Sequence, residues 1–557
     1  MAVVVTAAAF AVACSKDKDS GKITLDSPAV FFAQAGGSAT VGFTAQNIKT
    51  LSATSKPTGW DEAVVDLAGA TISVKAPSAE DIESGDAVKT GSFSFTGYTP
   101  GGTLVSATLF AGIVTTKDIS AEVANSYIVS EPETNYLIDA TRKSDGSLLA
   151  TSYVDVVWQT ASGFVQYADF EDGKASFYIG ADSDDATKIK QGNAVIGAYN
   201  ADDELIWSWH IWATDYDPDA EGGTVVFNDY TLMNRNLGAQ ANDNSTTDKI
   251  LASYGLYYQW GRKDPIPNSD VYYVDGVATD IASSYPVWQP ATLTEATIAA
   301  SVLRPGYIIN KPAVGDCSSW LGEDNRLLWG DSSQKTVTDG GWTDVKTIYD
   351  PSPVGYRVAN SATFTRFITP DRTDIQMKGV TGFRTIDGVT VPNLTYDYIQ
   401  CIVSTEMSGT TERWLPKGIH RNRIGFACNT SDNKSKIFGY GIYFRQTEDD
   451  TEGGYYPMGG CRFPNPSGKR SDYALNSYLW LSTSDINDYS AMSMHLYHFY
   501  WLTGSGNYTE PDKGLSGTGY NAGVVGTVKT KYSSYNLNAY GVRCVRDGST
   551  SGSTGGN

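Results

Sequence analysis

The sequence is poor in the residues that most often build catalytic and metal sites. It holds four histidines and six cysteines in 557 residues, and the cysteines stand far apart without a Cys-x-x-Cys pair. This spacing matches no common zinc-binding pattern and no disulfide-framework protein. The G-x-S-x-G, H-E-x-x-H and G-x-x-x-x-G-K-[ST] motifs are absent too. The sequence therefore predicts no catalytic residue, no bound metal and no cofactor.

Basic residues are also scarce. The chain has 42 Lys and Arg residues against 62 Asp and Glu residues, which gives a net charge of -20 at pH 7. An acidic chain without a basic stripe repels the phosphate backbone of nucleic acids. Nucleic-acid binding is therefore excluded.

Long apolar runs are absent except at the start of the chain. The run from Ala2 to Ala13 is shorter than the roughly 20 residues that span a bilayer, but it fits a signal-peptide core. It ends in Ala11-Val12-Ala13-Cys14, which resembles a bacterial lipobox, where the cysteine thiol receives the lipid. We expect Cys14 to be lipidated, residues 1–21 to be signal peptide and tether, and the protein to be anchored in the outer membrane, exposed at the cell surface. A buried N-terminal helix is the alternative.

What the chain has in quantity is glycine (56), tyrosine (34) and tryptophan (13). This composition is typical of short strands and tight turns. Residues 22–117 contain alternating segments such as Thr40–Thr44 and Thr71–Val74, which predict a β-sandwich. The region resembles the Ig-like modules, including the BACON type, near the N-terminus of Bacteroidetes surface lipoproteins. We expect it to be a spacer.

Residues 118–218 are expected to form a second β-sandwich. Ala194 to Tyr199 and Leu205 to Trp212 predict a hairpin around residues 200–203. Three indoles in the second of these segments indicate either an aromatic glycan platform or a strand covered on both faces. We favour the covered strand, because three exposed indoles would form a large apolar patch. His210 is then a hydrogen-bonded structural residue.

Residues 219–547 carry a series of motifs in a fixed order. They include Asn234-Arg235-Asn236-Leu237-Gly238, Tyr257-Tyr258-Gln259-Trp260-Gly261-Arg262, Pro353-Val354-Gly355-Tyr356-Arg357-Val358, Tyr478-Leu479-Trp480-Leu481 and Tyr540-Gly541-Val542-Arg543-Cys544-Val545-Arg546. In this order they resemble the Fibrobacter succinogenes major paralogous domain, a family of secreted and surface proteins of Fibrobacter and Bacteroidetes, including fimbrillin-associated lipoproteins.

The resemblance implies a C-type-lectin-like fold, in which a Gly-Tyr-Arg strand precedes a helix and a terminal strand closes the sheet. Ser352 stands where family members commonly have cysteine, so we predict no bridge between residues 352 and 544. The residues themselves suggest a capping box at Thr292 to Glu295 for a helix over Ala296 to Leu303, and a helix cap at Ser361. Residues 548–557 are expected to form a disordered tail.

Four residues are candidates for glycan binding. Trp480 and Trp501 can stack on a sugar ring, although each is equally suited to a core. Glu510-Pro511-Asp512 resembles the Glu-Pro-Asn or Gln-Pro-Asp triplet with which C-type lectins bridge calcium and a sugar diol. An exposed turn is the alternative for Glu510 and Asp512, and we predict no metal there.

Together these features predict a mainly β protein with an α+β C-terminal domain: two Ig-like β-sandwich modules followed by a C-type-lectin-like domain. The expected function is that of a lipid-anchored surface binding protein or adhesin, associated with a pilus tip, that contacts glycans or host protein and is not an enzyme. The alternatives are a polysaccharide-active surface enzyme and a purely structural pilus or scaffold subunit.

Overall fold

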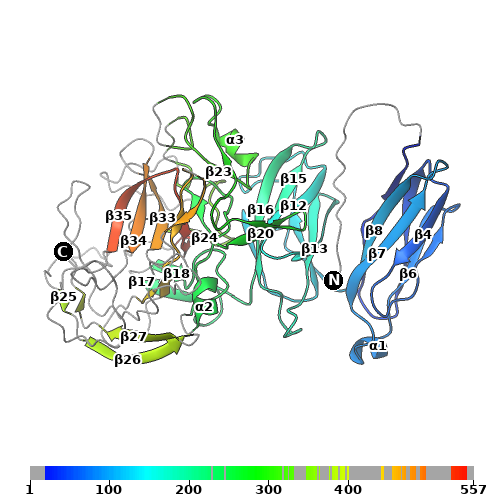
Figure 1. The fold of residues 1–557 in the computed structure, drawn as a ribbon, viewed down its shortest axis with the longest axis horizontal. Coiled ribbons are helices and arrows are strands. Elements are labelled where there is room, and N and C mark those ends of the chain that lie inside the picture. Colours follow the sequence, from blue (N-terminus) through cyan, green and yellow to red (C-terminus); the bar gives the residue numbers. More distant parts are fainter. Residues whose placement is uncertain are drawn as a thin grey trace.

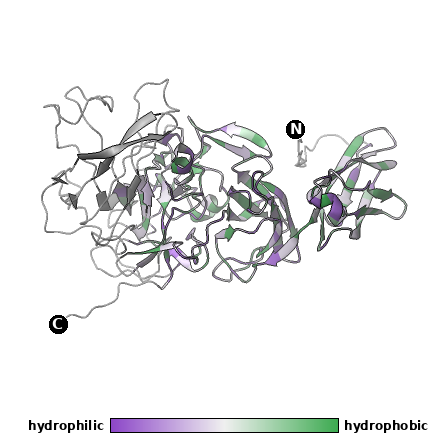
Figure 2. Ribbon diagram, turned by 90° about the horizontal axis from the view of Figure 1, so that it is seen from below, coloured by the Kyte–Doolittle hydropathy of each residue, from purple (hydrophilic) through white to green (hydrophobic). Residues whose placement is uncertain are grey.

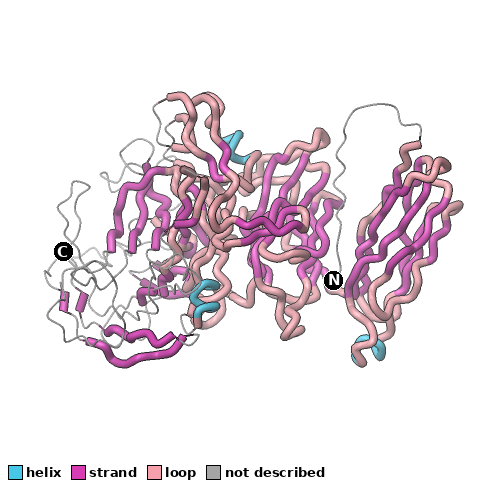
Figure 3. The backbone as a smooth tube through the Cα atoms, in the orientation of Figure 1, coloured by secondary structure: helices cyan, strands magenta, loops and turns pink. Residues whose placement is uncertain are grey.

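The computed structural model shows a mainly β protein whose modules follow one another along its longest axis (Figure 1). The helices with described bounds are three short pieces, α1 (Ala79–Glu83), α2 (Thr247–Ala252) and α3 (Ile298–Val302), drawn cyan in Figure 3. In the part of the chain described here, no helix has the length and apolar character needed to cross a membrane. The structure describes residues 19–227, 230–243, 246–315, 319–323, 325, 327–330, 346–360, 363, 455–465, 467–471, 477–484, 490–496 and 528–548, and the backbone of 375–376, 379–386, 389–395, 398–399 and 441–443.

The first module is a sandwich of two four-stranded sheets, as the alternating segments predict. Ile72 and Val74 point inward with Phe93 and Phe95, and all four are at most 3% exposed. Hydrophobic and hydrophilic residues are interspersed along its strands (Figure 2). One sheet is β1 (Lys22–Leu25), β3 (Ser38–Gln46), β6 (Thr71–Lys75) and β5 (Val64–Asp66); the other is β2 (Ala29–Phe32), β8 (Leu104–Ile113), β7 (Thr90–Tyr98) and β4 (Thr50–Ser55).

The second module is also a sandwich, and the predicted hairpin is confirmed as β15 (Gly192–Tyr199) and β16 (Leu205–Ala213). Its larger sheet takes two strands from beyond residue 218, since the hairpin β20 (Val271–Val274) and β21 (Val277–Asp280) pairs with its edge. The six-stranded sheet runs β10 (Ser126–Val129), β16, β15, β12 (Tyr153–Gln159), β20, β21; the four-stranded sheet runs β13 (Val165–Glu171), β14 (Lys174–Ile179), β11 (Thr134–Asp139), β9 (Thr115–Asp118).

The connection between the two sandwiches is very short. Strand β8 ends at Ile113 and β9 begins at Thr115, so a single buried residue, Val114, connects the modules. Val114 packs in an aromatic cluster with Phe110 from the first sandwich and Tyr178 from the second. The packed joint fixes one sandwich on the other.

The third module is built on two sheets. In the first of them, the strand of the Gly-Tyr-Arg motif, β24 (Tyr356–Val358), pairs with the terminal strand β37 (Cys544–Arg546). That sheet is β17 (Thr224–Phe227), β18 (Tyr230–Met233), β37 (Cys544–Arg546), β24 (Tyr356–Val358). The second is β32 (Arg470–Ser471), β31 (Cys461–Arg462), β36 (Ala539–Val542), β33 (Ser477–Ser484), β34 (Ser490–Leu496), β35 (Val528–Tyr535), with β19 (Tyr258–Gln259) on β36.

Smaller strand pairs surround these sheets. The helix expected over Ala296 to Leu303 is shorter than predicted, since α3 begins at Ile298. Its N-cap is Thr297 and not Thr292, and the Thr297 hydroxyl accepts a hydrogen bond from the Ala300 N–H. Of the helix expected after Ser361, the structure describes Thr363 alone, which is helical. The tail from residue 549 lies outside the described residues. The remaining pairs are β22 (Val287–Trp288) with β23 (Ile308–Ile309), β25 (Ile375–Gln376) with β28 (Tyr398–Ile399), β26 (Gly379–Ile386) with β27 (Val389–Thr395), and β29 (Gly441–Tyr443) with β30 (Tyr455–Pro457).

Packing is continuous between the second and third modules. Trp158, Val195 and Trp212 of the second sandwich belong to one buried apolar cluster with Tyr258 and Trp260 of the third module. The outer face of the six-stranded sheet is thus largely covered by residues that follow it in the chain.

Candidate functional site

The structure removes Trp480 from the predicted glycan-binding residues. Trp480 is 0% exposed, its indole N–H donates to the Tyr258 carbonyl at 2.8 Å, and its ring packs on Tyr540 at a centroid distance of 4.5 Å. A ring buried on both faces cannot stack on a sugar, so the prediction for Trp480 is wrong. Trp501, Glu510, Asp512 and Cys14 lie outside the described residues.

The tryptophan-rich strand β16 is covered on both faces, as predicted. Trp207, Trp209 and Trp212 are at most 1% exposed. His210 is buried between two partners, with Nδ1 2.9 Å from the Ser126 hydroxyl and Nε2 2.9 Å from Asn193 Oδ1. Burial lowers the pKa of His210 from 6.5 to about 3, and a neutral ring satisfies both contacts. The structural role predicted for His210 is confirmed.

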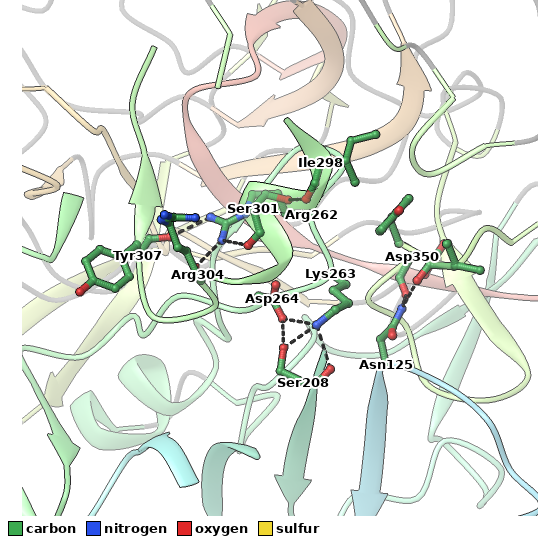
Figure 4. A network of polar contacts seen from close by, with 12 residues as sticks. Asn125, Ser208, Arg262, Lys263, Asp264, Ile298, Ser301, Arg304, Tyr307 and Asp350 are labelled. Atoms are coloured by element: carbon green, nitrogen blue, oxygen red, sulfur yellow. Dashed lines mark hydrogen bonds and ion pairs between the residues drawn. The ribbon is translucent and has the colours of Figure 1, made fainter. Parts of the chain in front are cut away.

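A buried arginine organises the loop that follows α3 (Figure 4). The Arg262 side chain donates to the Tyr307 carbonyl and to the Arg304 carbonyl, both at 2.8 Å. Another guanidinium N–H donates to Gln259 Oε1 at 2.8 Å, and Gln259 in turn accepts from the Ile309 N–H. Because these donors are buried, charge-assisted hydrogen bonds hold the backbone of residues 304–309 in one conformation.

Next to Arg262, a buried ion pair lies at the contact between the second and third modules. Lys263 and Asp264 have side chains that are 1% and 4% exposed, and Lys263 Nζ lies 2.6 Å from Asp264 Oδ1. Lys263 also donates to the carbonyl and hydroxyl of Ser208 in β16 (Figure 4). All three ammonium hydrogens therefore have acceptors, while the ring of Trp207 lies 4.5 Å away.

Ser208, Lys263 and Asp264 are residue types that can form a catalytic site, with serine as the nucleophile and lysine as its general base. Burial lowers the pKa of Lys263, as a general base requires. However, Ser208 is 1% exposed and donates to Asp264 at 2.6 Å, so its hydroxyl has no open side for a substrate. The arrangement supports a structural ion pair.

A partly exposed aromatic surface lies beside the loop that Arg262 fixes. Among the described tryptophans, Trp288 alone is not buried. The guanidinium carbon of Arg304 lies 3.9 Å from the centre of the Trp288 ring, and Tyr307 is 44% exposed nearby in sequence. Pairing of β22 with β23 sets Trp288 opposite Ile309, directly after this loop. Trp288, Arg304 and Tyr307 form what we call the α3 surface, together with Leu303, which is 48% exposed.

The α3 surface combines an indole, a guanidinium and a phenol. Arg304 is held by helix α3, which precedes it in the chain, since its Nη1 donates to the Ala300 carbonyl at 2.8 Å. Such a set can stack on a planar or ring-shaped ligand and donate hydrogen bonds to it. The sequence signal for this surface was limited to Arg304-Pro305-Gly306-Tyr307, a turn flanked by an arginine and a tyrosine.

Comparisons with known proteins name no family for the chain. No protein-family model matches it, and no curated protein matches it. A protein of the Bacteroides ovatus mixed-linkage glucan utilization locus, solved with a mixed-linkage heptasaccharide, is 10% identical over 33% of this chain and 42% of its own, with a TM-score of 0.10. The Yersinia pseudotuberculosis adhesin InvE is 11% identical over 42% and 80%, with a TM-score of 0.12. The N-terminal Ig1-2 module of the Drosophila receptor protein tyrosine phosphatase DLAR is 12% identical over 35% and 98%, with a TM-score of 0.12.

The chain therefore spans less than half the length of the first of these structures. TM-scores this low do not establish a common overall arrangement, so the function has to be argued from the residues themselves. No group of three metal-ligating side chains occurs among the residues that the structure describes. Cys544 donates to the Ser352 hydroxyl at 3.2 Å, so position 352 adjoins Cys544.

Proposed function

We propose that this protein is a lipid-anchored binding protein of the bacterial cell surface, and that it contacts glycans or host protein through its third module without catalysis. The α3 surface carries the proposal. Trp288 is the one described tryptophan left partly open, and buried hydrogen bonds of Arg262 fix the loop beside it. Aromatic and arginine side chains held rigidly at a surface are typical of binding hot spots.

The two sandwiches suit the role of a spacer. The packed joint around Val114 resists bending between them, and continuous packing joins the second sandwich to the third module. A ligand bound at the α3 surface would thus be held at a set distance from the start of the first sandwich, to which the tether after Cys14 connects. We assign the third module to the C-type-lectin-like fold as part of the same proposal, with support from the pairing of β24 with β37.

The absence of catalysis is the second part of the proposal. One described set of converging acid and base groups, Lys263, Asp264 and Ser208, makes its hydrogen bonds internally in the core. His495, which contacts the Ser493 and Ser534 hydroxyls, is 2% exposed and likewise buried. Release of sugar from a polysaccharide by the purified protein would refute this part and favour the enzyme alternative.

Binding is tested with the full chain on arrays of immobilised glycans and of host extracellular proteins. Trp288→Ala and Tyr307→Ala are expected to weaken binding by more than about tenfold, because each removes an exposed ring of the α3 surface. Tyr98→Ala is the matched control, since Tyr98 is 46% exposed on the first sandwich, against 44% for Tyr307. Equal binding by all three variants would contradict the proposed site.

The anchor is tested separately. Cys14→Ala should move the protein from the membrane fraction to the soluble fraction, because the thiol that carries the lipid is lost. Unchanged fractionation would count against a lipid on Cys14 and leave the binding result untouched.

A further inference from the structure

A second aromatic spot lies on the outer face of the six-stranded sheet. Tyr153 in β12 and Tyr199 in β15 are direct partners across the two strands, and both are partly exposed. Their rings are stacked, with centroids 4.8 Å apart and an angle of 4° between the planes. Tyr199 lies over Gly197, where an added Cβ would be 3.1 Å from Tyr199 Cε2. The pair is thus preformed on the sheet.

Carboxylates surround this tyrosine pair. Asp155 lies on β12 between the strand ends, while Asp203 and Asp275 sit in the turns β15–β16 and β20–β21. Desolvation, followed by the charge of Asp155 and then of Asp275, raises the pKa of Tyr199 to about 12, and desolvation with the charge of Asp203 raises the pKa of Tyr153. The rings are therefore neutral phenols beside hydrogen-bond acceptors of negative charge.

The tyrosine pair adjoins the α3 surface. A Cβ added to Gly306, the residue before Tyr307, would lie 3.7 Å from Val157 Cγ1. On its other side, Val157 Cγ2 would lie 3.0 Å from a Cβ added to Gly197, the glycine beneath Tyr199. One valine flanked by two residues without side chains therefore separates the two aromatic spots, and helix α3 itself packs against β16 of the same sheet.

We propose that the α3 surface and the tyrosine pair are two subsites for one neutral glycan chain several sugar units long, an inference that rests on the proposed function. Aromatic faces at both ends suit the apolar faces of sugar rings, and the aliphatic side chains of Val157 and Leu205 lie beside Gly197 between them. Asp155, Asp203 and Asp275 accept hydrogen bonds from sugar hydroxyls. The same three charges, in a chain of net charge -20, repel sulfated and uronic-acid glycans.

The experiment measures the affinity of the full chain for neutral β-glucan, xylan and mannan oligosaccharides of increasing length, with sulfated and uronic-acid glycans in parallel. Affinity should rise with length for one neutral series. Tyr153→Ala should weaken binding of the longest oligosaccharide by about tenfold and leave the shortest unchanged, because only the long chain reaches both subsites. Tyr153→Phe should bind nearly as the native protein does, since the ring is kept.

The outcomes separate this inference from the proposed function. Loss of glycan binding in Trp288→Ala, with no effect of Tyr153→Ala at any length, would overturn the second subsite and leave the proposed function standing. Preference for anionic glycans would overturn the charge argument and with it the inference. Binding to host protein and to no glycan would overturn the inference as well, while the broader binding function survives. A loss in Tyr98→Ala equal to that in Tyr153→Ala would also refute it.

Discussion

Acid should destabilise the second sandwich through His210. The pKa of His210 is about 3 in the folded protein against 6.5 for the free side chain, because burial excludes the charged ring. Above pH 6.5 the ring is neutral in both states, and stability is complete. Between pH 6.5 and pH 3 only the unfolded state takes up the proton, so stability falls by about 1.4 kcal/mol per pH unit. At pH 4 the loss reaches about 3.4 kcal/mol.

Hydrogen exchange at pH 7 and pH 4 measures this loss locally, as the opening free energy of amides in β10 and β16. His210→Gln keeps hydrogen-bonding groups near Ser126 and Asn193 but cannot titrate. Between pH 7 and pH 4, the opening free energy of the variant should therefore fall by about 3 kcal/mol less than that of the native protein. A ring-proton NMR titration of the four histidines gives the second readout. The reasoning fails if the His210 resonance titrates above pH 5, or if both proteins lose stability equally.

Three further changes have defined outcomes. Asp264→Asn leaves the buried ammonium of Lys263 without its counter-charge and should lower the free energy of unfolding by about 3–5 kcal/mol in a urea titration. Ser352→Cys places a second thiol against Cys544, so oxidation should form a disulfide, detected as a mass loss of about two hydrogens. Phe110→Ala empties the aromatic joint between the sandwiches and should broaden the distribution of particle dimensions in small-angle X-ray scattering.

Matched controls accompany these changes. Asp270→Asn removes an ion pair with Arg470 whose carboxylate is 58% exposed, so it should cost about 0–1 kcal/mol. An equal loss in Asp264→Asn would contradict the buried ion pair. Leu148→Ala, at a side chain 76% exposed in the second sandwich, should leave the scattering unchanged. A reduced Ser352→Cys protein that resists oxidation would contradict the contact with Cys544.

Local sequence patterns were sufficient for individual strands and hairpins. Alternation placed Ile72 and Val74 inward, and a polar turn between two apolar segments marked the hairpin of β15 and β16. These features depend on neighbours in the chain, and period-two alternation records them directly.

Features that depend on distant contacts were missed. Nothing in Val271–Val274 or Val277–Asp280 indicates that this hairpin joins a sheet formed more than fifty residues earlier. Trp480 and Trp288 look alike in sequence. Trp480 is fully buried against Tyr540, whereas Trp288 packs on the edge of the core under the Arg304 guanidinium and stays partly exposed, because tertiary packing alone decides how far an indole is covered. The sequence predicted the helix cap at Thr292, whereas the structure has it at Thr297. Both threonines offer the same hydroxyl at a plausible spacing, so the sequence alone did not distinguish them.

The hairpin of β20 and β21 has a consequence for protein synthesis. A ribosome releases residues 126–213 well before residues 271–280, so the nascent second sandwich begins to fold with the edge of β12 and the ring faces of Trp158 and Trp212 still open to water. Until the later strands emerge, that edge is available to any other extended chain. Expression of residues 19–218 alone would make this temporary state permanent, and aggregation of such a fragment is the expected result.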